Sequence, residues 1–158
     1  MILADIREQT KTILSGVSGI GVVHDYDRLA VDVATLKKFF QDSEGRINGW
    51  TIAREATPER WLTNIDYERV FEMTIRGYYG LQDAAASEIV FQDLIEAICD
   101  KFRGNDTLNG TCETICPEFG NMVGKSGLQV AVVEPRMFGS ILCHYVELRL
   151  GVQIKGQR

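Results

Sequence analysis

The residues closest to a cofactor-binding pattern run from Gly120 to Ser126 and end in Gly-Lys-Ser. A phosphate-binding loop has four residues between its first glycine and that ending. It also has a strand before it and a helix after it, so that helix-terminal amides meet the phosphates. Here only three residues intervene, and a strand pattern follows in place of a helix. Spacing and context therefore argue against nucleotide binding.

Cysteines offer a second possible chemistry. Cys112 and Cys116 are separated by three residues, and Cys99 and His144 are the other conceivable metal ligands. Zinc sites usually combine two close pairs, and only one is present. We expect no metal and no cofactor, and we interpret the four cysteines, Cys143 included, as free thiols of the core and loops. A small enzyme or metal-binding module built on Cys112, Cys116 and His144 is the competing interpretation.

Nucleophilic catalysis would have to use one of only two histidines, His24 and His144. His144 lies on the apolar face of a predicted strand, where a hydrogen-bonded core histidine is the usual case. His24 precedes Asp25 in a short extended segment, and we expect a structural hydrogen bond there. No carboxylate pair stands out, so we expect no catalytic residue and no enzyme activity.

Apolar periodicity predicts which elements position these residues. A helix is expected over 2–15, a short one capped by Asp32, and the clearest one over 83–103. Alternating apolar residues predict strands over 46–56, 66–79, 128–134 and 142–155, with a turn at 134–139. We expect an α+β fold. A single domain over 1–158 would carry a mainly antiparallel four-stranded sheet of two long hairpins, with helices packed on one face.

Two connections are candidates for contacts with other molecules. The polar link 57–65 joins two predicted strands, and the 105–126 connection is unusually long for a compact domain. Aromatic residues and methionine at strand ends and turns mark contact surfaces, or else they cap the ends of the sheet. The candidate assembly contacts are Trp50, Arg60, Trp61, Tyr78, Tyr79, Arg136, Met137 and Phe138.

Composition narrows the class of protein. The 158 residues are 45% hydrophobic and 25% charged, with a net charge of −5 and no basic run, which disfavours tight nucleic-acid binding. No apolar run reaches the roughly 20 residues that span a bilayer. Charges at Asp5 and Arg7 interrupt the place of a signal-peptide core, so we expect synthesis in the cytoplasm and no membrane partner.

The order of the segments and their amino-acid sequences resemble those of the tail terminator, or tail completion, proteins of long-tailed bacteriophages. Size, segment order and the sheet-plus-helix pattern carry the resemblance across nearly the whole chain. The stretches concerned are GIGVVHDY (19–26), RINGWTI (46–52), FEMTIRGYY (71–79), AAASE (84–88), RMFG (136–139) and CHY (143–145).

The resemblance implies a structural virion protein in the tail or neck, assembled in the host cytoplasm. It implies a homo-oligomeric ring, expected to be a hexamer, at the head-proximal end of the tail tube. The ring would end tube polymerisation and join the tail tube protein to a neck or connector protein. Genomic DNA would pass through the lumen without specific binding, and an acidic surface without a basic stripe suits that role.

Two further interpretations remain open besides the enzyme or metal module. The first is a neck or head-completion protein next to the connector of the same virion, which would also self-associate. The second is a domain that recognises a peptide by adding it to a sheet edge.

Overall fold

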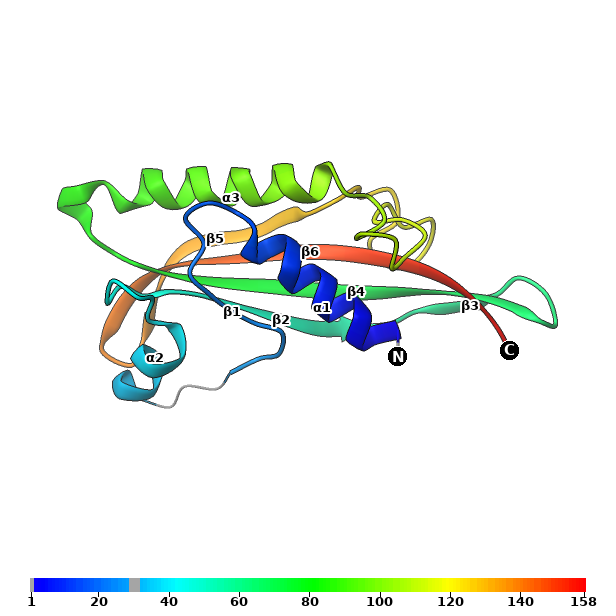
Figure 1. The fold of residues 1–158 in the computed structure, drawn as a ribbon, viewed down its shortest axis with the longest axis horizontal. Coiled ribbons are helices and arrows are strands. Elements are labelled where there is room, and N and C mark those ends of the chain that lie inside the picture. Colours follow the sequence, from blue (N-terminus) through cyan, green and yellow to red (C-terminus); the bar gives the residue numbers. More distant parts are fainter. Residues whose placement is uncertain (1, 29–31) are drawn as a thin grey trace.

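The computed structural model describes residues 2–28 and 32–158 and confirms the α+β class (Figure 1). Its elements, in chain order, are α1 (Ile2–Ser15), β1 (Val22–His24), α2 (Val33–Phe40), β2 (Asn48–Ala56), β3 (Glu59–Trp61), β4 (Asp66–Gly80), a 3-10 helix (Asp83–Ala85), α3 (Ser87–Arg103), β5 (Gln129–Phe138) and β6 (Ile141–Gln157). The predicted cap of α2 is confirmed, because the Asp32 carboxylate accepts a hydrogen bond of 2.7 Å from the Thr35 amide. That bond lowers the pKa of Asp32.

The sheet is mixed and has six strands in the described part of the chain, so the predicted four-stranded antiparallel sheet is incomplete. Its order is β1-β2-β4-β6-β5, with β3 on β4, and β1 pairs with β2 in parallel. The two additional strands, β1 and β3, have three residues each. Such short strands show no alternation in the sequence. Part of the predicted polar link 57–65 is therefore a strand.

The longest pairing joins β4 to β6. It runs without a break from Asp66 opposite Gln157 to Gly80 opposite Cys143. At about 3.3 Å per residue, β4 alone is roughly 50 Å long. The far end of this ladder, with β3 and the 62–65 turn, extends beyond the helices on the right of Figure 1.

One face of the sheet carries the main core. Residues of β4 and β6 that point to this face, such as Met73 and Leu148, pack with α1 and α3. The helix predicted over 83–103 is confirmed as α3 from Ser87 on, and its buried stripe includes Phe91, Leu94, Ile95, Ile98 and Phe102. Because these residues recur every three or four positions, they form one apolar face of the helix.

The prediction that all helices lie on one face is wrong, because α2 packs on the opposite face. Phe40 of α2 approaches Gly49 of β2, and a Cβ at Gly49 would lie 2.2 Å from a Phe40 ring carbon. Its neighbour Trp50 points to the face with α1 and α3. The missing side chain of Gly49 lets α2 come close to the sheet. With Leu36, Ile47 and Cys143, Phe40 forms a second, smaller core.

The β5–β6 hairpin also differs from its prediction. The sequence predicts a turn over 134–139, whereas β5 continues to Phe138 and Gly139 turns the chain with a φ of 62°. Pro135 lies inside β5. A proline is tolerated there because β5 is the edge strand of the sheet.

The 105–126 connection folds around the edge of β6 that β5 leaves unpaired. Thr114 pairs with Gln153, and the Gln153 amide donates to the Thr114 carbonyl at 2.9 Å. Before this point Leu108 is buried in the main core, and after it Met122 lies against Gly151 on the opposite face. The connection therefore packs on both faces of the sheet.

A close approach at the sheet centre gives the first prediction. A Cβ at Gly77 would lie 2.3 Å from Cζ3 of the fully buried Trp50. We expect Gly77→Ala to lower the free energy of unfolding by about 1–3 kcal/mol through overpacking, measured by urea denaturation.

Gly104→Ala is the matched control for Gly77→Ala. Gly104 has a φ of −83°, and the nearest atom to an added Cβ is 3.8 Å away. We expect a change within about 0.5 kcal/mol. Equal effects of the two substitutions would contradict the packing at Trp50.

Candidate assembly surfaces

The far end of the ladder exposes large apolar side chains. We call this end the tip and define it as residues 59–66 with Arg158. Trp61, Leu62 and Ile65 are 61%, 44% and 60% exposed. The Arg158 guanidinium lies 3.6 Å above the Trp61 ring, and the indole N–H donates to Glu59 at 3.1 Å. Trp61 is thus held in place with most of its surface uncovered.

Arg60 points away from this apolar surface and braces the tip. Its Nε donates to Glu68 at 2.8 Å, and its Nη2 donates to Glu118 at 3.3 Å. The guanidinium also lies 4.4 Å from the centre of the Phe119 ring. Arg60 therefore ties the tip to the 105–126 connection, with little freedom to contact another molecule.

The candidates near the β5–β6 hairpin form an aromatic cluster with α2. Tyr78 stacks on Phe40 at 4.7 Å and meets Phe138 edge-on at 4.8 Å. Burial raises the pKa of Tyr78. Arg136 lies 4.0 Å above the Tyr145 ring. Most of these side chains cap the end of the sheet, the second of the two roles considered for them. Met137 differs, because it is 57% exposed.

Two of the predicted contacts belong to the main core face. Trp50 is fully buried, and its indole N–H donates to Asn48 at 3.0 Å. A side chain without exposed surface cannot contact a second molecule while the subunit keeps this fold, so Trp50 is removed from the candidates. Tyr79 stacks on Phe91 at 5.4 Å and is half-buried.

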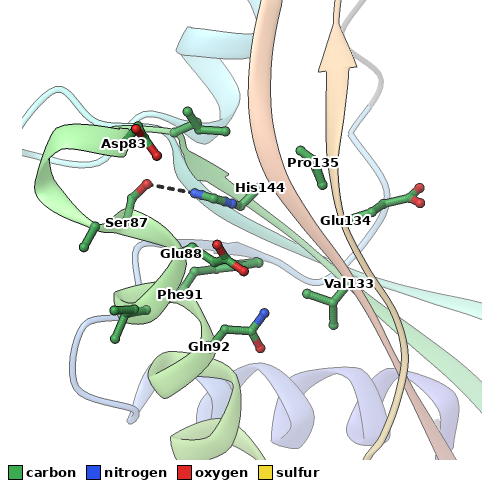
Figure 2. Close-up of a pocket in the computed structure, with 12 residues that line it drawn as sticks. Asp83, Ser87, Glu88, Phe91, Gln92, Val133, Glu134, Pro135 and His144 are labelled. Carbon is green, nitrogen blue, oxygen red and sulfur yellow. Dashed lines mark hydrogen bonds between the residues drawn. The ribbon is translucent and has the colours of Figure 1, made fainter.

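A groove between α3 and β5 was missed by the sequence reasoning. Its volume is about 390 Å³, and its lining includes Glu88 and Phe91 of α3 and His144 of β6. Figure 2 shows Val133 and Pro135 of β5 pointing toward α3, whereas Glu134 points away. The sequence carried one signal: Ile89 of the helix lies outside its buried stripe, lines the groove and is 64% exposed.

The groove contains a hydroxyl–imidazole pair. The Ser87 Oγ lies 2.8 Å from His144 Nε2 and accepts a hydrogen bond of 2.8 Å from the Gln82 amide (Figure 2). A nucleophile–base pair normally has a third group that orients the base. Within residues 2–28 and 32–158, no side chain hydrogen-bonds the other ring nitrogen of His144. The pair ties the start of α3 to β6.

The other residues considered for chemistry have structural contacts. His24 Nε2 is 2.7 Å from the Phe39 carbonyl oxygen, the hydrogen bond that the sequence predicts. Gly120 has a φ of 86°, and an added Cβ would lie 2.8 Å from Pro58. Its neighbour Asn121 donates its backbone amide to the buried Glu72 at 2.9 Å. Gly120, the first glycine of the apparent phosphate loop, therefore allows a tight turn that packs against the sheet.

Of the conceivable metal ligands, Cys99 and Cys116 line one cavity, and Cys112 and His144 do not line it. Cys112 and Cys116 flank Thr114, which pairs with Gln153, whereas His144 is near the start of β6, roughly 30 Å away along the strand. All four cysteines are free. Among the described residues, no group of three or more His, Cys, Asp or Glu side chains could hold a metal ion.

Comparisons with known proteins leave the family unassigned. No family model matches the sequence, and a search of curated proteins finds no match. Over the described residues, no helix is both long and apolar enough to cross a membrane.

Burial gives the thiols different reactivities. It raises the pKa of Cys112 to about 12 and that of Cys143 to about 11, whereas Cys116 is exposed. At pH 8 Cys112 is then almost entirely in the thiol form, whereas the thiolate is the form that reacts. We expect iodoacetamide at pH 8 to modify Cys116 first, as measured by mass spectrometry, and Cys116→Ser to remove the fast phase. Modification of Cys112 at a similar rate would contradict its burial.

Proposed function

We propose that this chain is a structural virion protein of the phage tail terminator type. Copies form a ring, expected to be a hexamer, at the head-proximal end of the tail tube. The ring ends tube polymerisation and joins the tail to the neck or connector. In this proposal the protein is not an enzyme and uses no cofactor.

One observation carries the proposal: the sheet continues past its own core and ends in uncovered apolar side chains. Trp61, Leu62 and Ile65 lie at this end, and each is at least 44% exposed. Exposed apolar surface gathered in one place is typical of interaction sites. Such an exposed apolar end, with no catalytic or metal site assembled among the described residues, is expected of a protein that functions by binding other proteins.

The polar face of the sheet supports passage of DNA without binding. Arg76 contacts Asp27 at 3.1 Å and Glu55 at 3.5 Å, and Arg149 contacts Glu147 at 3.7 Å. Arginines that bind DNA need to be free for phosphate oxygens. Arginines already paired with carboxylates, in a protein of net charge −5, favour a surface that phosphates do not adhere to.

Substitution of Trp61 tests the proposal. We expect Trp61→Ala to weaken self-association about tenfold or more, because the substitution removes the largest exposed apolar surface of the tip. The free energy of unfolding should change by less than about 1 kcal/mol, since the side chain is mostly exposed. Light scattering over a concentration series measures the first quantity, and urea denaturation measures the second.

Tyr26→Ala is the control, because Tyr26 is another exposed aromatic residue (50%) and lies away from the tip. We expect it to leave self-association unchanged. A large loss of stability with intact assembly in Trp61→Ala would instead identify Trp61 as a core residue. Capping of preformed tail tubes by the wild-type protein distinguishes a terminator from a neck protein, which would bind on the connector side.

A further inference from the structure

We propose that the tip of one copy docks into the groove between α3 and β5 of the next copy, so that the ring contact is head-to-tail. The inference rests on the proposed function and names the two surfaces that meet. It is carried by the position, the apolar character and the charge of these surfaces.

The groove has apolar residues on both sides, and the carboxylates of Asp83 and Glu88 line it on the side of α3. Ile89 on the α3 side and Val133 on the β5 side are 64% and 40% exposed. Glu88 lies on the same helix, is exposed, and forms no ion pair with any side chain in the described part of the chain. The lining residues include neither lysine nor arginine.

The tip provides the complementary surface. Arg158 lies 3.6 Å above the ring of Trp61, and its guanidinium donates to the Asn64 carbonyl at 3.3 Å. Across the described residues, no carboxylate side chain pairs with it. An exposed aromatic residue covered by an arginine side chain fits a groove whose lining combines apolar residues with carboxylates and has no lysine or arginine. Aromatic and arginine side chains are also the residues that dominate interface energetics.

The geometry prevents the two surfaces from meeting within one chain. Trp61 pairs with Tyr67, and His144 in the groove pairs with Tyr79. Tyr67 and Tyr79 lie near the two ends of β4, roughly 40 Å apart at the usual rise per residue. Figure 1 shows the tip at one end of the molecule and the start of α3 at the other.

A contact between two different patches is heterologous, and it forms a closed ring when the rotation between neighbours closes. A contact between two identical patches would stop at a dimer. Two complementary surfaces at opposite ends of a rigid sheet therefore favour assembly beyond the dimer, which a ring requires.

A charge exchange tests the pairing of Arg158 with Glu88. We expect Arg158→Glu and Glu88→Arg each to raise the apparent dissociation constant for self-association about tenfold, measured by light scattering at low salt. Mixing the two variants lets unlike subunits alternate so that every contact pairs opposite charges, and the double variant exchanges both charges within one chain. Both the mixture and the double variant should therefore recover at least half of the loss. Glu96→Arg, also exposed on α3, is the matched control and should have little effect.

A mixing experiment tests the head-to-tail arrangement itself. Trp61→Ala combined with Leu62→Ser removes the tip surface, and Val133→Glu places a charge in the groove. Each variant alone should be monomeric, because every contact needs one tip and one groove. An equal mixture should form one-to-one dimers and no rings, as measured by native mass spectrometry. Circular dichroism confirms that each variant is folded.

The outcomes separate this contact from the proposed function. Rings that form from either variant alone would overturn the tip–groove contact while leaving the terminator proposal standing. A wild-type chain that stays monomeric at its highest soluble concentration would also overturn the contact, and capping of tail tubes would then decide the function separately. Loss of tube binding by the tip variant, with rings intact, would assign the tip to the tail tube protein instead.

Discussion

The unbroken pairing of β4 with β6 is the constraint on which the other elements depend. Because side chains alternate along both strands, the pairing produces an apolar face with the main core and a more polar opposite face, which carries the smaller core at one end. The apolar face takes α1 and α3, and the polar face takes α2 at one end and the 105–126 connection at the other. The ladder is longer than the core that covers it, so an uncovered end follows from its length.

Much of this fold was predictable from local pattern. The alternation around Phe71 and Leu148 and the helical stripe of Phe91 and Ile98 act over short distances, and both predictions are confirmed. The side on which α2 packs was not predictable, because it depends on Phe40 fitting over Gly49, a contact between elements. The extended segment around His24 was predicted and forms β1, whereas the parallel pairing of β1 with β2 and the presence of β3 depend on neighbouring strands.

The candidate surfaces were predictable only where exposure follows from a turn. Trp61 and Met137 were selected for their place near turns, and both are exposed. Trp50 was selected by residue type, but its strand is covered by α3, and it is buried. The groove brings together Glu88, Val133 and His144 from three different elements. Residues so far apart in the sequence show no spacing pattern that would predict their proximity. The only indication of the groove in the sequence was Ile89, an apolar residue outside the buried face of α3.

The direction of the long ladder determines how the subunit responds to force. Hydrogen bonds between antiparallel strands lie across the strands. Tension along the axis of β4 and β6 therefore loads all the bonds of the ladder together in shear, whereas tension across the sheet would open them one after another. If neighbouring subunits pull on one another through the two ends of the sheet, the force acts along β4 and β6, the direction in which all the ladder bonds share the load. Such a subunit resists stretching with its whole length and yields first at the loops.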